Sequence, residues 1–191
     1  MLRAILFDMD GTITRPHIDW PALRHRVGVP EGMPIMEFID GLPGSERARA
    51  SALVEEVEME AAHSAVLNPG VHDLLGRLRT RPVRLALITN NHRRAMLTVV
   101  EKFGLEFDLL LCREDAQLKP APDLLLLALD RLQIQAAEAC SVGDGRYDRD
   151  ASQAAGIPYV HLTHDGQTPV AGPTVRSLDE LWEHLSGSGL L

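Results

Sequence analysis

Four groups of polar residues in this 191-residue chain could do chemistry, because each lies at or just beyond the end of a short apolar run. In chain order they are Asp8-Met9-Asp10-Gly11-Thr12, Thr89-Asn90-Asn91, Lys119-Pro120 and Gly143-Asp144-Gly145-Arg146-Tyr147-Asp148. At the ends of the runs they supply four carboxylates, the hydroxyl of Thr89 and the ammonium of Lys119. Carboxylates brought together repel one another unless a cation neutralises them. This set of side chains therefore indicates a cation site.

The apolar runs in front of these groups are typical of strands in a parallel sheet covered by helices. Their residues are almost continuously apolar, which indicates burial on both faces of the sheet. Ligands of such sheets bind beyond the carboxyl ends of the strands. The four polar groups are therefore expected along one edge of an α/β sheet, whose strands are predicted at 4–7, 85–88, 109–112, 139–142 and 158–162.

The predicted helices between these strands have readable ends. Glycine at 104 and at 156 favours a left-handed C-terminal position after two of them, and Pro122 suits the first turn of a third. Ser177 to Glu180 has the pattern of a capping box, which opens the last helix. The expected helices span 91–103, 123–132, 148–155 and 178–185.

Residues 15–68 break the alternation of strands and helices. The segment has helical patterns at 20–27, 35–39 and 46–66, with Ser45 as the expected N-cap of the last. It is far longer than the ~2–6 residues of an ordinary connection between a strand and a helix. We therefore expect a small helical cap of residues 15–68, inserted after the first strand, and a core of residues 1–14 and 69–191.

Composition limits the classes of partner. Acidic residues outnumber basic ones by 27 to 19, for a formal charge of −8, which disfavours nucleic acid because binding phosphates requires a basic surface. No apolar run approaches the ~20 residues that cross a bilayer, so no membrane partner and a cytoplasmic location are expected. Two cysteines, Cys112 and Cys140, are too few for a disulfide framework and are expected to be small buried apolar residues. A monomer and a homodimer both fit the sequence.

The four groups, in this order, resemble the motifs of the haloacid dehalogenase superfamily, in its phosphatase branch with a helical cap, similar to phosphoglycolate phosphatases. The likeness extends from Phe7 to about Gly156. It implies a Rossmann-like parallel sheet, a bound Mg²⁺ and hydrolysis of small phosphorylated metabolites through an aspartyl-phosphate. Only two lysines occur in the chain, and Lys119 stands where the third motif of the family needs one.

The resemblance also implies a role for each motif residue. Asp8 would attack phosphorus, and Asp10 would first protonate the leaving alcohol and then deprotonate water. Mg²⁺ would be held by the Asp8 carboxylate, the Asp10 backbone carbonyl and Asp144, with Asp148 at the edge of the site. The phosphoryl oxygens would be bound by Thr89, the amide of Asn90 and Lys119. Gly11 would allow a tight backbone turn beside the phosphate.

Single sequence features argue against two other activities of the superfamily. Asp10 argues against a dehalogenase, which lacks this second acid, and the absence of lysine from residues 15–68 argues against a phosphonate hydrolase. A sugar-phosphate mutase keeps the same catalytic set and stays open as an alternative, as does a phosphate-binding or regulatory module without turnover. Phosphoglycolate, sugar phosphates and nucleoside monophosphates all remain possible substrates.

Residues outside the motifs give weaker signals. His92 follows the second motif and could contact substrate, although a structural role is the commoner outcome. The glutamates of the third cap helix are expected on a solvated face; they are Glu55, Glu56, Glu58 and Glu60. The cationic residues that could bind a carboxylate of the substrate are Arg15, His17, Arg24, Arg26, Arg47 and Arg49.

Overall fold

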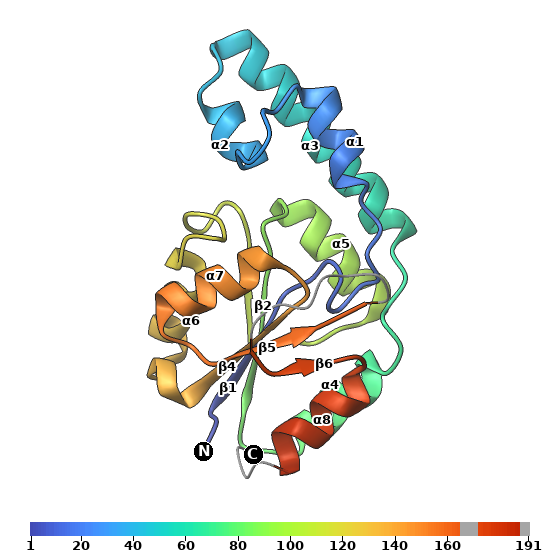
Figure 1. Ribbon diagram of the computed structural model, residues 1–191. Helices are drawn as coiled ribbons and strands as arrows, with labels where there is room; N and C mark the ends of the chain where they lie inside the picture. The colour runs from blue at the N-terminus through green and yellow to red at the C-terminus, as the bar shows by residue number, and fades with distance from the viewer. Residues whose placement is uncertain (165–171, 188–191) are drawn as a thin grey trace.

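Six parallel strands form one sheet in the computed structural model, which describes residues 1–164 and 172–187. Their order across the sheet is β3-β2-β1-β4-β5-β6, with helices on both faces (Figure 1). The strands are β1 (Ala4–Phe7), β2 (Arg84–Ile88), β3 (Leu109–Leu111), β4 (Ala139–Gly143), β5 (Tyr159–Leu162) and β6 (Thr174–Val175). This is the parallel α/β sheet that the sequence predicts.

Alternate residues of each central strand point to opposite faces of the sheet, and both faces are covered. Ile5 and Phe7 of β1 join one buried cluster, whereas Ala4 and Leu6 join another. The first cluster is completed by α4 (Val71–Arg79), α5 (Arg93–Phe103) and α8 (Leu178–Gly187). The second is completed by α6 (Asp123–Leu132) and α7 (Arg146–Ala155), with the short 3₁₀ turn η1 (Ala136–Glu138) leading into β4. Burial on both faces explains why the strands read as continuous apolar runs.

Several element boundaries differ from the sequence-based predictions. Helix α5 begins at Arg93 rather than 91, because Asn91 and His92 extend away from β2, and α7 begins at Arg146 rather than 148. Helix α4 and strand β6 were not predicted. Strand β6 has only two residues, too few for an apolar pattern to stand out.

Three helices form the cap, at one end of the molecule in Figure 1. They are α1 (Trp20–Val27), α2 (Ile35–Asp40) and α3 (Gly44–Ser64), and they share a small core of Leu23, Ile39 and Val54. Helix α3 follows Pro43 directly, so the prediction of Ser45 as its N-cap is wrong. Pro43 is the extended residue before the helix, with φ −66° and ψ 153°, and no side chain caps the first turn. All three helices lie within residues 15–68; the exact cap boundaries stay a prediction.

The chain crosses between core and cap twice, and the two crossings are bonded to each other. Arg15 donates its backbone N–H to Val66 at 2.8 Å, and Asn68 donates its own to Ile13 at 2.9 Å. The buried Asn68 side chain also donates to the carbonyls of Gly11 and Thr14 at 3.0 and 3.1 Å. This pairing fixes the base of the cap beside the loop that follows β1.

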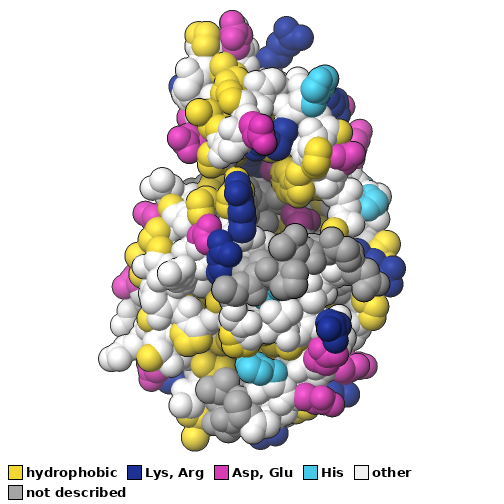
Figure 2. Space-filling model, viewed as in Figure 1, with side chains coloured by type: hydrophobic (Ala, Val, Ile, Leu, Met, Phe, Trp, Pro, Cys, Tyr) yellow, Lys and Arg dark blue, Asp and Glu magenta, His cyan; other side chains and the backbone are white. Residues whose placement is uncertain are grey.

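The surface in Figure 2 shows the cap as a lobe above the core, with acidic and basic side chains scattered over both. None of the helices in the described part of the chain is long and apolar enough to span a bilayer.

Candidate functional site

The strand order places the predicted motif residues at one edge of the sheet. Strand β1 lies between β2 and β4, because the chain adds β2 and β3 on one side of β1 and then crosses to the other side to add β4, β5 and β6. Ligands of parallel sheets bind at such a point. Asp8, Thr89 and Asp144 each follow the carboxyl end of one of these three strands.

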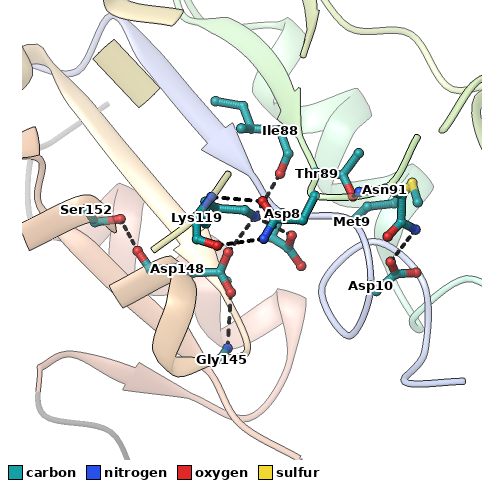
Figure 3. Close-up of polar contacts among 12 residues, drawn as sticks. Asp8, Met9, Asp10, Ile88, Thr89, Asn91, Lys119, Gly145, Asp148 and Ser152 are labelled. Carbon is teal, nitrogen blue, oxygen red and sulfur yellow. Dashed lines mark hydrogen bonds and ion pairs between the residues drawn. The ribbon is translucent and has the colours of Figure 1, made fainter. Parts of the chain in front are cut away.

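An ion-pair network lies at the centre of this edge. Lys119, which is 5% exposed, donates from Nζ to Asp8 and to Asp148, each at 2.6 Å (Figure 3). It also donates to the Ile88 carbonyl at 2.9 Å. Asp148 was expected at the edge of the site; it is instead buried beside Asp8, in the first turn of α7, where its other oxygen accepts the N–H of Gly145.

The carboxylates next to Lys119 suit a divalent cation. Asp8, Asp144 and Asp148 each present an oxygen within 4.8 Å of the others. Three carboxylates facing one ammonium leave net negative charge, and oxygen donors are the ligands that hard divalent cations prefer. Gly11 lies against this group, because a Cβ built there would be 1.9 Å from Asp144 Oδ2. Its φ of +86° also favours glycine.

The pKa values reflect this crowding. Burial raises the pKa of Asp8 well above its usual range, and the charge of Asp148 raises it further, against the opposing effect of Lys119. Burial by itself would lower the pKa of Lys119, but Asp148 and Asp8 outweigh it and raise that pKa. Lys119 therefore stays charged, and a divalent cation would stabilise the ionised form of Asp8.

Asp10 is set apart from this group and has its own partners. Asn91 donates from Nδ2 to its Oδ2 at 2.6 Å, and Figure 3 shows the two side chains turned toward each other. Thr14 donates to its Oδ1 at 3.4 Å. Burial raises the pKa of Asp10 to about 6; the Asn91 hydrogen bond lowers it, and the charge of Glu58 raises it. A carboxyl that titrates near neutrality can both give and take a proton.

We expect the free energy of unfolding of the metal-free protein to fall between about pH 4 and pH 6 through Asp10. The folded state binds this proton more tightly than the unfolded chain, with a pKa of about 6 against 3.8, so stability is lost as pH rises through that window. The loss is on the order of 3 kcal/mol. Urea unfolding in EDTA measures it, and Asp10→Asn should have the flatter profile. Identical pH profiles would contradict the raised pKa.

Thr89 and Asn90, which directly follow β2, contact other residues of the site. Thr89 is buried, and its hydroxyl oxygen accepts the Asn91 backbone N–H at 3.1 Å. The Asn90 side chain binds the Lys119 backbone at both ends, donating to its carbonyl at 2.8 Å and accepting its N–H at 3.0 Å. The Asn90 side chain thus holds Lys119 in place, and Thr89, Asn90 and Asn91 all line the cleft.

A cleft of about 1240 Å³ opens over these residues, between core and cap. Of the six predicted cationic residues, Arg24 lines it, and the Arg24 guanidinium is bonded to the carbonyls of Met33 and Pro30. Arg113, which the sequence analysis did not single out, lines it from the core. The apolar part of the lining comes from both sides: Trp20, Pro34, Ile35, Met36 and Val54 of the cap, and Ala116, Leu118, Pro120, Ala121 and Tyr147 of the core.

The family model for haloacid dehalogenase-like hydrolases matches residues 22–162. The chain belongs to this family. That confirms the resemblance drawn from the four motifs and the assignment as a hydrolytic enzyme. It agrees with the site geometry, in which residues of all four motifs lie at one edge of the sheet.

Named relatives support the same assignment of this haloacid dehalogenase-like hydrolase. A haloacid dehalogenase-like hydrolase domain-containing protein from Arabidopsis thaliana is 30% identical over 158 residues, covering 77% of this chain. The chain covers 64% of that relative, just under two thirds. A phosphoglycolate phosphatase from Cupriavidus necator is 30% identical over 207 aligned residues, covering 95% of this chain and 89% of its own. The β-phosphoglucomutase structure from Clostridium difficile has a TM-score of 0.78 at 20% identity, covering 98% of this chain and 96% of its own, which shows a shared fold.

The haloacid dehalogenase-like site also differs from one expectation. Glu58, predicted on a solvated face, is 3% exposed and lines the cleft, because His92 and Arg113 of the core supply its partners. His92 is buried against this carboxylate and is not among the residues that line the cleft, which agrees with the structural role favoured for it from the sequence. Cys112 and Cys140 are buried as predicted, and burial raises the pKa of each thiol to about 12, which leaves both unreactive.

Proposed function

We propose that the protein is a Mg²⁺-dependent phosphomonoesterase that hydrolyses small phosphorylated metabolites through an aspartyl-phosphate on Asp8. The observation that carries this proposal is the arrangement of Asp8, held by Lys119, beside Asp144 and apart from Asp10. A nucleophile, a cation site and a separate acid–base group are the three parts that this reaction needs.

In the first step, an Asp8 carboxylate oxygen attacks phosphorus, the bond to the leaving oxygen breaks, and Asp10 donates a proton to that oxygen. In the second, water attacks phosphorus and the bond to Asp8 breaks, while Asp10 takes a proton from the water. Lys119 and Thr89 would stabilise charge on the phosphoryl oxygens. When bound by Asp8, Asp144 and the Asp10 carbonyl, Mg²⁺ would supply charge neutralisation for the incoming phosphate.

Phosphoglycolate is the first substrate to test, because it is the substrate in the names of several relatives. A panel of phosphoglycolate, sugar phosphates and nucleoside monophosphates, assayed for phosphate release, tests the proposed activity. With Mg²⁺ we expect release from at least one small phosphomonoester. EDTA should lower the rate by about 100-fold or more, with recovery on adding Mg²⁺. An unchanged rate in EDTA would contradict the metal role, and conversion of one isomer into another with a bisphosphate activator would indicate a mutase.

Gly11→Ala is expected to weaken Mg²⁺ binding by about 10- to 100-fold, as measured by calorimetric titration. The new methyl group would displace the Asp144 carboxylate, which lies 1.9 Å from the built Cβ. Gly28→Ala is the matched control, since Gly28 also has a positive φ, of 79°, but nothing within 4 Å of a built Cβ. Both variants carry the strain of a left-handed alanine, about 1–2 kcal/mol. Equal Mg²⁺ affinities in the two variants would count against a ligand role for Asp144.

A further inference from the structure

A buried carboxylate joins the cap to the core. Glu58 of α3 accepts a hydrogen bond from His92 Nδ1 at 2.5 Å and from the His92 backbone N–H at 3.1 Å. It also forms a short ion pair with Arg113. All three bonds end on the same oxygen, Oε2. An ionised carboxylate so deeply buried is stable only with partners of this kind.

The partners of Glu58 come from the two core segments that border the site. His92 is the residue before α5, and Arg113 follows β3. The Arg113 side chain is 14% exposed and also contacts Met36 of α2 through sulfur at 3.0 Å. Glu58 and Arg113 therefore link two cap helices to the carboxyl edge of the sheet.

The same two segments hold Asn91, the direct partner of Asp10. Asn91 precedes His92 in the chain, and its backbone carbonyl accepts the Arg113 N–H at 3.1 Å. It is 3% exposed, and its Nδ2 donates to Asp10 at 2.6 Å. A chain of contacts thus runs from Glu58 through His92 and Arg113 to Asn91, and from Asn91 to the carboxyl that transfers the proton.

We propose that Glu58 of the cap is a positioning residue for Asp10: by fixing His92 and Arg113 it holds Asn91 in the place from which its amide orients the Asp10 carboxylate. The proposal rests on the proposed function and adds to it. Proton transfer to the leaving group is then efficient only while the cap lies against the core, because the cap itself supplies the carboxylate.

The leaving group provides a readout specific to this role. An alkyl phosphate releases an alkoxide, which needs a proton from Asp10, whereas p-nitrophenyl phosphate releases a phenolate that needs little acid assistance. The value of kcat/KM covers steps up to the first irreversible one, here the transfer to Asp8. A misplaced Asp10 should therefore lower kcat/KM for the alkyl substrate and spare that for the aryl substrate.

The test compares Glu58→Gln, Asn91→Ala, their double variant and the control Glu56→Gln, which changes an exposed glutamate of the same helix. The substrates are the best alkyl phosphate of the panel and p-nitrophenyl phosphate. We expect Glu58→Gln and Asn91→Ala to lower kcat/KM for the alkyl phosphate by about 10- to 100-fold, and for the aryl phosphate by less than about 3-fold. Glu56→Gln should change neither. The double variant should lose no more than Asn91→Ala alone, because both substitutions act through one path.

Equal losses on both substrates, or no loss on either, would overturn the positioning role while leaving the proposed function standing. Additive losses in the double variant would also overturn it. If Glu58→Gln does not fold, Glu58→Asp is tested instead. It keeps the negative charge, but its side chain is shorter by one methylene group and ends further from His92 and Arg113. A wild-type protein that hydrolyses no alkyl phosphate has no alkoxide for Asp10 to protonate, and that outcome removes the proposed function and this role together.

Discussion

Asp8→Asn is expected to lower phosphate release by about 10⁴-fold or more, the scale seen when a covalent nucleophile is removed. Asparagine keeps the shape of the side chain and its carbonyl oxygen can still accept from Lys119, which lies 2.6 Å from Asp8 in the structure. It has no carboxylate to attack phosphorus, so no aspartyl-phosphate forms. The measurement is phosphate release from p-nitrophenyl phosphate. Its phenolate leaving group needs little protonation, so the formation of the aspartyl-phosphate depends little on Asp10.

A trapping experiment separates the loss of the nucleophile from a general loss of structure. The wild-type protein should bind beryllofluoride, a mimic of the phosphoryl group on Asp8, and Asp8→Asn should not. Asp73→Asn, an exposed aspartate in the first turn of α4, is the control and should keep both activity and trapping. Appreciable turnover by Asp8→Asn would show that another group attacks phosphorus.

Lys119→Met is expected to lower activity by about 10³-fold and to lower the free energy of unfolding at pH 7 by about 3–5 kcal/mol. Methionine fills a similar volume but leaves Asp8 and Asp148 facing each other without the ammonium that lies 2.6 Å from each. Removing one member of a buried ion pair costs this much because the remaining charge stays buried and unpaired. Urea unfolding and steady-state kinetics measure the two effects.

The stability deficit of Lys119→Met should shrink as pH falls. Burial and Asp148 already raise the pKa of Asp8 in the folded protein, and Lys119 opposes them. Without Lys119 that pKa rises further, so Asp8 takes up a proton at a higher pH and the repulsion with Asp148 ends. Lys102→Met, at the other lysine, is the control: its ammonium binds the carbonyls of His63 and Ala65, far from the Asp8 group in sequence. A deficit that is equal at pH 5 and pH 7 would contradict this electrostatic account.

The sheet and the motif residues could be predicted because both signals are local. A strand buried on two faces is a continuous apolar run, and the residue that follows it lies at the edge of the sheet whatever the rest of the chain does. Asp8, Thr89 and Asp144 were found in this way. Gly11 was also predicted, as the residue of a tight turn. Its close approach to Asp144 was not, because the two residues are 133 positions apart in the sequence.

The environment of Glu58 could not be predicted from its neighbours in sequence. Four glutamates lie within six residues of α3, and such a run is ordinarily solvated. Glu58 is buried because its partners lie 34 and 55 residues further along the chain. For the same reason, the hydrogen bond from Asn91 to Asp10 was not predicted, since the two residues are 81 positions apart. Such polar contacts leave no periodic pattern, so only the folded structure reveals them.

The paired crossings between core and cap have a mechanical consequence. Because Arg15 is bonded to Val66 and Asn68 to Ile13, the two connections between core and cap are held side by side. Paired connections of this kind are suited to act as one hinge between two domains. Thr14 lies in the first connection, where it pairs with Leu67 of the second and donates from its hydroxyl to the Asp10 carboxylate. A rotation of the cap about these connections would displace α2, at the far end of the cap, more than Asp10, which lies beside them; it would also part Glu58 of α3 from its partners in the core.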